Sequence, residues 1–165
     1  MQMRYWLRLD NMQYEISGDD MTPWGFIEVP KKPDPHQEIY AWDINKWDWV
    51  ISEQLARGAI ALSRYERETA GITFNGNQFH TTDRSKTMLC GAAIKCLRDE
   101  NKTFHWKTSD GQFIELSSTD ILALHDAVID YVESCFSREQ SLVNSLLQNE
   151  LIAEMIDEGW PSNNL

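Results

Sequence analysis

The sequence predicts an α+β fold: a β-rich N-terminal piece, a connecting helix, and two β-hairpin–helix units with a long C-terminal helix. Two observations lead to this prediction. Apolar residues alternate with polar ones near the N-terminus, as in strands, whereas from residue 51 to residue 70 they follow a helical period. In addition, FNGNQFHTTD at 74–83 and SDGQFIELSSTD at 109–120 repeat one phrase: strand, turn dipeptide, strand, then hydroxyl and aspartate residues that can begin a helix.

Residues 1–50 form the predicted β-rich, Trp-rich region. Between Met3 and Leu9 apolar and polar residues alternate, apart from Trp6, and Asp10-Asn11 can turn the chain into a second alternating run. The segment VPKKPDPH at 29–36 follows, and its three prolines favour an extended linker over a helix or a strand. We therefore expect a small β unit that continues into a Pro-rich linker.

The stretch IYAWDINKWDWV at 39–50 predicts a two-stranded ribbon. A loop at 43–46 would set Trp42 opposite Trp47, and facing aromatic rings stabilise such a ribbon by about 0.5 to 1 kcal/mol. A ribbon alone is marginal in water, so it must dock on another surface. Trp42, Trp47 and Trp49 are therefore either part of the chain's own core or a candidate partner interface, since tryptophan is frequent at interface hot spots.

Residues 51–165 form the predicted α+β hairpin–helix domain. Its connecting helix spans 51–70, and Gly71 is placed to end it. The apolar face predicted for this helix consists of Ile51, Leu55, Ala59, Leu62 and Tyr65. Two further helices, at 83–98 and from 118 onward, each follow a hairpin.

The two hairpin–helix units are expected to share one core, because two ribbons side by side can bury aromatic rings that neither could bury alone. Asn75-Gly76 and Asp110-Gly111 accept the positive φ angles of tight turns, so they fix where each ribbon folds. The predicted shared core consists of Phe74, Phe79, Leu89, Phe104, Trp106, Phe113, Leu124 and Val128.

The last helix is predicted to continue for about 40 residues, because no glycine or proline interrupts it before Gly159. Beyond the polar residues at 137–140 its apolar stripe consists of Leu142, Val143, Leu146, Leu147, Leu151, Ile152, Met155 and Ile156. Three alternatives for this stripe stay open: contact with another chain, packing on the N-terminal strands, or a separate short helix. The candidate interface residues on the first alternative are Leu142, Val143, Leu146, Leu147, Leu151 and Met155.

Charge and composition exclude several classes of partner. The formal net charge is −11, so most of the surface would repel a phosphate backbone, and we expect no nucleic-acid binding. The acidity either keeps the protein soluble or matches a basic partner surface. The sequence has no run of about 18 apolar residues and no apolar signal core, so we expect no membrane insertion and synthesis in the cytosol.

No catalytic, cofactor-binding or metal site is predicted. The sequence contains no nucleophile elbow, P-loop, dinucleotide fingerprint or HExxH motif, and its four histidines are not at metal-ligand spacing. Cys90, Cys96 and Cys135 lie in apolar helical patterns, where a thiol packs as a small hydrophobic group. We therefore expect a protein without enzymatic activity.

Two parts of the sequence resemble proteins of bacteriophage tails. In VPKKPDPHQEIYAWDINKWDWV a Val-Pro, a spaced proline and a W-x(4)-W-x-W pattern resemble the N-terminal region of tail-fibre assembly and related small tail proteins. The matching residues are Val29, Pro30, Pro33, Trp42, Trp47 and Trp49. Downstream, 71–97 and 104–142 resemble an uncharacterised α+β domain of phage and prophage tail proteins.

The resemblance implies a non-enzymatic role at a phage tail fibre. The chain would be a chaperone-like assembly factor that binds a tail-fibre protein in the host cytoplasm. Alternatively, it would be a small structural subunit that remains in the virion tail. Because tail fibres of the resembled class are trimers, the resemblance also implies that the C-terminal stripe forms a homo-oligomer, with a trimer favoured, or lies against a trimeric fibre.

Overall fold

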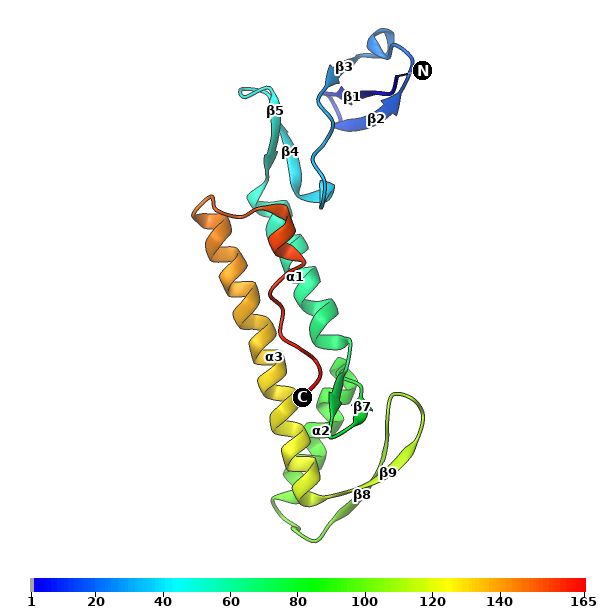
Figure 1. Cartoon of the computed structure of the whole chain (residues 1–165), viewed down its shortest axis with the longest axis vertical. Coiled ribbons are helices and arrows are strands. Elements are labelled where there is room, and N and C mark those ends of the chain that lie inside the picture. The colour runs from blue at the N-terminus through cyan, green and yellow to red at the C-terminus, as the bar shows by residue number, and fades with distance from the viewer. Residues whose placement is uncertain (1) are drawn as a thin grey trace. The chain divides into compact units, whose positions relative to one another are not determined.

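The structure, a computed structural model that describes residues 2–165, has the predicted α+β architecture (Figure 1). The chain divides into two compact units. Unit 1 comprises the chain up to Ala59 together with Ile152–Glu154, and unit 2 comprises Ile60–Leu151 with Met155–Leu165. Helix α1 (Glu53–Thr69) contributes residues to both units.

Unit 1 begins with a three-stranded antiparallel sheet in the order β2-β1-β3. Its elements are β1 (Arg4–Arg8), β2 (Gln13–Ser17), the 3₁₀ turn η1 (Thr22–Trp24) and β3 (Phe26–Val29). The alternating pattern correctly predicts β1 and β2, and it places Leu7 in a cluster with Trp42 and Trp49. Trp6 breaks the alternation because it is buried on the opposite face, where its Nε1 donates to the Ser17 carbonyl at 3.4 Å.

The predicted two-stranded ribbon follows the Pro-rich segment. It consists of β4 (Tyr40–Asp43) and β5 (Asp48–Ile51), after the 3₁₀ turn η2 (Gln37–Ile39). The predicted pairing is wrong, because the register sets Trp42 opposite Trp49, with 5.2 Å between the ring centroids. Trp47 lies in the turn with a left-handed φ of 54°, because the four-residue turn spans 44–47 instead of the predicted 43–46.

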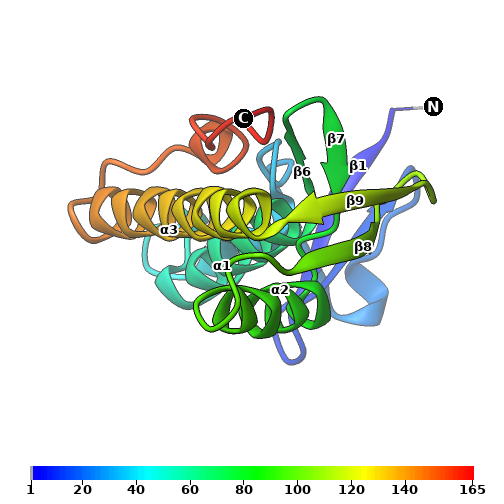
Figure 2. The ribbon, with the colours of Figure 1, turned by 90° about the horizontal axis from the view of Figure 1, so that it is seen from below.

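Unit 2 contains both predicted hairpin–helix units, which lie next to each other in both views (Figures 1 and 2). The first consists of β6 (Ile72–Phe74), β7 (Asn77–Phe79) and α2 (Asp83–Cys96), and the second of β8 (Thr103–Lys107), β9 (Phe113–Ser117) and α3 (Ser118–Leu147). Thr82 caps α2 by accepting a hydrogen bond from the Ser85 backbone, and Ser117 caps α3 in a reciprocal capping box with Asp120. The predicted turns and helix starts are thus confirmed.

One hydrophobic core joins the two hairpin–helix units, as predicted. Its buried members include Phe79, Leu89, Leu124 and Val128, with Phe74, Phe104 and Trp106 packed against them. Phe113 is an exception, because the alternation along β9 turns Ile114 and Leu116 toward the core. Phe113 therefore faces outward and is 72% exposed, so its predicted place in the core is wrong.

Tyr131 is a buried polar member of this core. Its hydroxyl donates a hydrogen bond to the Arg67 carbonyl at 2.9 Å. Burial of the phenol, together with the nearby Cys135 thiol, raises the pKa of Tyr131 to about 12.

Because the pKa of Tyr131 is raised in the folded protein, the free energy of unfolding falls at alkaline pH. An unfolded tyrosine titrates at about pH 10, so the contribution of Tyr131 is fully present below about pH 10 and is lost as the pH rises to about 12. We expect Tyr131→Phe to flatten the alkaline decline in the free energy of unfolding, measured by urea titration between about pH 8 and about pH 12. A decline as steep as that of the wild type would contradict the buried phenol.

Helix α1 occupies the predicted range but buries a different face. The predicted inward residues Leu55, Leu62 and Tyr65 are exposed, whereas Ala56 and Ile60 are fully buried. Further along the helix the buried face continues through charged residues. An apolar pattern cannot reveal such a face, because its members are matched by ion pairs rather than by hydrophobic contacts.

Those charged residues form an ion network among α1, α2 and α3. Glu68 is 4% exposed and accepts hydrogen bonds from Arg64 Nη1 at 2.6 Å and from Lys86 Nζ at 3.0 Å. Arg64 Nε also lies 2.8 Å from Glu139 Oε2. Burial alone would lower the pKa of Lys86, but its hydrogen bonds with Glu68 and Asp83 outweigh burial and raise it. The network fixes how the three helices meet.

Helix α3 ends at Leu147, earlier than predicted. Asn149 takes a left-handed φ of 58°, and its backbone N–H donates to the Leu146 carbonyl, which closes the helix. A 3₁₀ turn, η3 (Ala153–Ile156), follows. The prediction of one helix of about 40 residues is wrong, and the separate short helix comes closest among the three alternatives.

The C-terminal segment folds back along unit 2. Arg138 on α3 donates from Nη2 to the Met155 carbonyl at 2.9 Å. At the far end of the segment, the Thr73 backbone of β6 donates to Asn163 at 2.7 Å and accepts from Leu165 at 2.8 Å. Residues that the sequence assigned to a projecting helix are therefore tied to their own chain.

Candidate partner-binding surface

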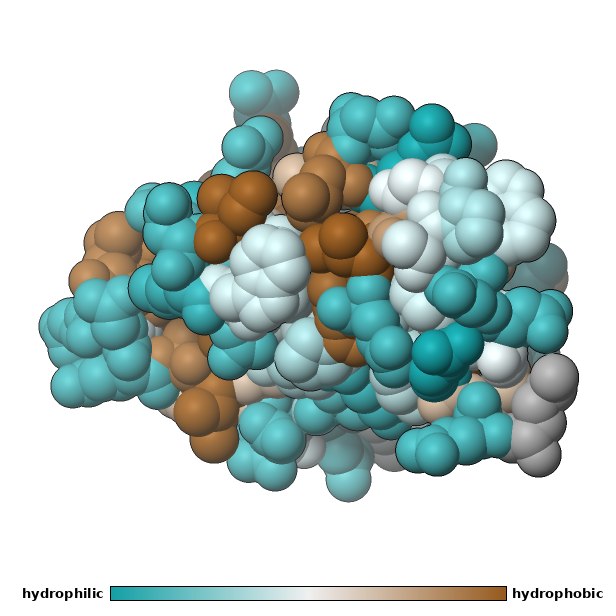
Figure 3. Space-filling view, turned by 90° about the horizontal axis from the view of Figure 1, so that it is seen from above, coloured by the Kyte–Doolittle hydropathy of each residue, from teal (hydrophilic) through white to brown (hydrophobic). Residues whose placement is uncertain are grey.

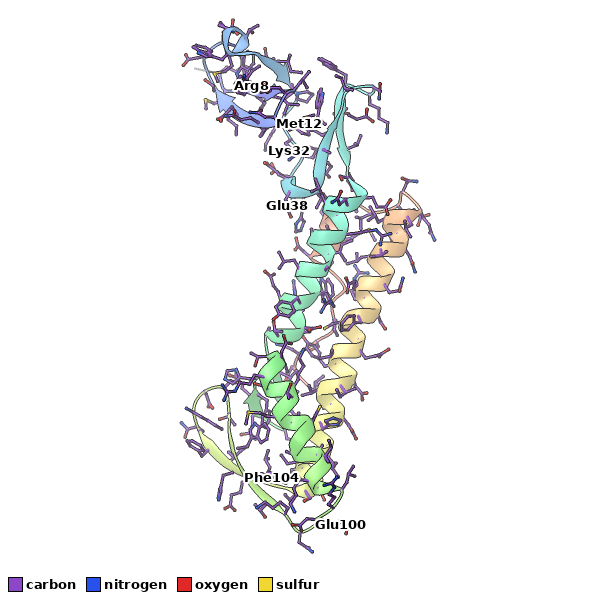
Figure 4. All side chains as sticks on the ribbon, turned by 180° about the vertical axis from the view of Figure 1, so that it is seen from behind. Arg8, Met12, Lys32, Glu38, Glu100 and Phe104 are labelled. Carbon is purple, nitrogen blue, oxygen red and sulfur yellow. The ribbon has the colours of Figure 1, made fainter. Side chains whose placement is uncertain are left out.

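The three tryptophans of the predicted interface divide between core and surface. Trp42 and Trp49 are buried in unit 1, whereas Trp47 is 52% exposed and contacts the edge of Trp42 at 5.5 Å between centroids. Trp49 is further fixed by a hydrogen bond from Nε1 to the Pro30 carbonyl at 2.9 Å. The ammonium group of Lys32, labelled in Figure 4, lies 5.1 Å from the Trp49 ring. Of the three rings, Trp47 alone offers area to a partner.

The C-terminal stripe divides in the same way. Its buried members are Leu142, Leu146, Leu151 and Ile156, and its half-buried members are Val143 and Met155. Leu147 and Ile152 are the members that remain exposed. The stripe is therefore not the wide free face on which the predicted homo-oligomer depends.

The β8–β9 hairpin exposes Phe113, an aromatic residue that we predicted to lie in the core. Phe113 directly follows the turn at 108–112, and its ring lies 5.8 Å from the ammonium group of its cross-strand partner Lys107. The inward side chains of the hairpin, including Phe104 labelled in Figure 4, pack on the core. The run FIELS contained the signal, because Phe113 is out of phase with the two apolar residues Ile114 and Leu116.

The turn beside Phe113 is held by several hydrogen bonds. Asp110 accepts from the Thr108 hydroxyl and from the Gln112 backbone N–H, and these bonds lower the pKa of its carboxyl group. The Ser109 backbone N–H donates to the Gln78 carbonyl of β7 at 2.9 Å. Phe113 is thus presented from a preorganised turn that is tied to the neighbouring hairpin.

A hollow of about 240 Å³ lies between the two hairpins. It is lined by Phe74, Asn75, Asn77, Phe79, Ile114, Glu115, Leu116, Asp120 and Leu124. Phe79 and Leu124 are buried at its inner wall, whereas Asn75 and Glu115 are exposed at its rim. The hollow therefore combines an apolar wall with a polar rim, and Phe113 is not among its lining residues.

Unit 1 carries a wider hollow of about 370 Å³ beside the sheet. Its polar residues are engaged with neighbours: Arg8, labelled in Figure 4, pairs with Asp10 at 3.0 Å, and Gln13 donates to Glu15 at 2.9 Å. Exposed apolar residues of this unit include Met12, Ile16, Trp24 and Ile44. On the face seen in Figure 3, hydrophobic residues lie in several small groups among hydrophilic ones.

Cys90 on α2 and His125 on α3 are far apart in the sequence but lie next to each other in the structure. Cys90 Sγ lies 3.7 Å from His125 Nε2, and Asp126 Oδ1 lies 3.3 Å from His125 Nδ1. A thiol beside an imidazole is an arrangement found in nucleophilic catalysis. Neither residue lines either of the two hollows described above. The pair forms a contact between α2 and α3.

Metal clusters and membrane helices are both missing from residues 2–165. No group of three or more His, Cys, Asp or Glu side chains in this range is arranged to hold a metal ion. None of the helices in the same range combines the length and the apolarity that a bilayer crossing requires.

A family model described as a domain of unknown function, DUF4376, matches residues 52–158. No curated protein and no solved structure matches the chain. The matched range includes α1, both hairpin–helix units and the hollow between the hairpins, and it leaves out β1 to β5. Phe113 and the hollow between the hairpins therefore lie within the matched range.

Proposed function

The chain belongs to the DUF4376 family, whose description assigns no function, and from this premise we propose that the protein is a non-enzymatic assembly factor that binds a phage tail-fibre protein. The phage part of the proposal rests on the resemblance of 29–50, 71–97 and 104–142 to phage tail proteins. The binding part rests on the surface of unit 2, where the chain presents an aromatic side chain from a rigid hairpin. The proposed place of action is the host cytoplasm during assembly.

The exposed side chain of Phe113 is the observation that carries the binding part. A phenylalanine that a partner covers contributes about 1.5 to 3 kcal/mol relative to its exposed state. The hairpin is already fixed by its core contacts and by the bond from Ser109 to Gln78, so little conformational entropy is lost on binding. Aromatic anchors of this kind dominate interface energetics.

Co-expression with a tail-fibre protein encoded next to this chain tests the proposal. We expect the wild-type chain to increase the yield of soluble fibre protein and to co-purify with it. Phe113→Ala should abolish both effects while the chain stays folded, because the side chain makes few contacts within the monomer. Phe136→Ala removes the same atoms from an exposed phenylalanine on α3 and should leave both effects unchanged.

Two outcomes would count against this proposal. A wild-type chain that neither solubilises nor retains the fibre protein would overturn the function. Equal losses in Phe113→Ala and Phe136→Ala would remove Phe113 as the contact.

The alternative function is a small structural subunit that remains in the virion tail or tail fibre. The same resemblance supports it, because it includes small tail proteins as well as assembly proteins. Mass spectrometry of purified particles separates the two functions. An assembly factor should be absent from the particles, whereas a structural subunit should be present at fixed stoichiometry.

A further inference from the structure

We propose that the hollow between hairpins β6–β7 and β8–β9 receives a cationic side chain, arginine or lysine, from the partner protein. The inference rests on the proposed function, because the partner is the tail-fibre protein named there. The hollow lies in unit 2, within the range that the family model matches. Three features of its lining determine the chemistry of the occupant.

The inner wall of the hollow is apolar. Phe79 and Leu124 belong to the shared core, and Phe74, Ile114 and Leu116 pack against that core. An occupant that reaches this wall gains contact area if its inner part is aliphatic or aromatic. A fully polar group would lose its hydration there without a matching hydrogen bond.

The rim carries carboxylate and amide groups. Glu115 has a side chain that is 69% exposed, and its Oε1 lies 3.6 Å from Nδ1 of the exposed His105 ring. Asp120 is already engaged by the hydroxyl and backbone N–H of Ser117, and these hydrogen bonds lower the pKa of its carboxyl group. Asn77 donates from Nδ2 to the Asn75 carbonyl at 3.3 Å, which leaves its side-chain oxygen as a further acceptor.

The charges around the hollow decide whether an anionic, an apolar or a cationic side chain fits it best. No lysine or arginine lines the hollow, and the whole chain carries a formal charge of −11. An anionic occupant would face Glu115 and Asp120, and a purely apolar occupant would cover the Glu115 carboxylate without pairing it. A long cationic side chain satisfies both regions, because its aliphatic stem suits the wall and its charged end suits the rim.

The position of the hollow fits a partner that also covers Phe113. Phe113 and Glu115 are two residues apart on β9, so they share the outward face and lie about 7 Å apart along the strand. Ile114 and Leu116 line the hollow from the opposite face of β9, so a partner that covers Phe113 and also fills the hollow must reach around the edge of this strand. Arginine suits the rim better than lysine, because its planar guanidinium can bond a carboxylate and an amide oxygen together.

Nuclear magnetic resonance titration of the isotope-labelled full chain tests the chemistry without the fibre protein. The two probes are N-acetyl-argininamide and N-acetyl-citrullinamide, which have similar shapes but differ in charge. We expect the arginine probe to shift the backbone amides of Asn77 and Leu116, and the citrulline probe to leave them in place. Equal shifts with the two probes, or no shift with either, would overturn the inference.

Two substitutions test whether the carboxylate of Glu115 binds the cationic probe. Glu115→Gln should abolish the arginine-dependent shifts, whereas Glu133→Gln, an equal change of charge at an exposed position on α3, should preserve them. In fibre binding we expect Glu115→Gln to reduce affinity about tenfold. Equal effects of the two substitutions would indicate net charge rather than the hollow and would overturn the inference.

The two proposals fail in distinguishable ways. Fibre binding that is lost in Phe113→Ala but unchanged in Glu115→Gln would overturn the cationic occupant and leave the fibre-binding function intact. Arginine-specific shifts without any binding to the fibre protein would overturn the fibre-binding function and leave the hollow as a site for a cationic side chain.

Discussion

Phe79→Ala should lower the free energy of unfolding by about 3 to 5 kcal/mol, whereas Phe113→Ala should lower it by less than about 1 kcal/mol. Phe79 is 3% exposed and Phe113 is 72% exposed. The two substitutions remove the same atoms, so the difference between them reports burial. In the core the removal leaves a cavity that Leu124 and Val128 cannot fill, whereas on the hairpin surface water takes the vacated space.

Urea titration of the wild type and both variants checks this result. The slope of the unfolding free energy against urea concentration should be the same in all three proteins, so that differences in the midpoint report differences in stability. A loss below about 1 kcal/mol at Phe79 would contradict the shared core of the two hairpin–helix units. A loss at Phe113 as large as that at Phe79 would contradict its outward orientation.

Leu146→Glu should destabilise the protein by about 3 to 5 kcal/mol, whereas Leu147→Glu should change stability by less than about 1 kcal/mol. The two leucines are neighbours in the last turn of α3, but Leu146 is 8% exposed and Leu147 is 55% exposed. A glutamate at the buried position is an unpaired charge without water. At the exposed position the new carboxylate stays hydrated.

Thermal unfolding and light scattering of these two variants check the result together. Similar losses in both variants would contradict the division of the C-terminal stripe into a buried and an exposed part. Light scattering of the same samples also tests the predicted homo-oligomer, with a trimer favoured. A wild-type trimer that Leu147→Glu converts to a folded monomer would place an interface on the exposed part, and a monomeric wild type at high micromolar concentration would remove the prediction.

The sequence predicted the elements of unit 2 well, because each is fixed by local chemistry. Asn75-Gly76 closes the first hairpin, and Ser117 with Asp120 begins α3. The face of α1 could not be predicted, because Glu68 is buried through ion pairs with Arg64 on the same helix and with Lys86 on α2. The end of α3 was also missed, since the left-handed residue that closes it is Asn149 rather than a glycine or a proline.

Less of the candidate surface could be predicted. The tryptophan pattern indicated a ribbon, but the choice between core and partner contact depended on the position of the turn. The turn lies at 44–47 instead of 43–46, which pairs Trp42 with Trp49 and leaves Trp47 in the turn. The hollow requires β7 and β9 to lie side by side, which no spacing in the sequence encodes. Phe113 was assigned to the core because phenylalanines are usually buried, although its phase along β9 indicated the outward face.

Hydrogen exchange of the full chain, with and without the tail-fibre protein, tests the central claim most directly. We expect the fibre protein to slow exchange at 75–79 and 103–117, where the hollow and Phe113 lie, and to leave β1 to β3 unchanged. Protection confined to the N-terminal sheet or to the ribbon that carries Trp47, with no change at the two hairpins of unit 2, would contradict the claim.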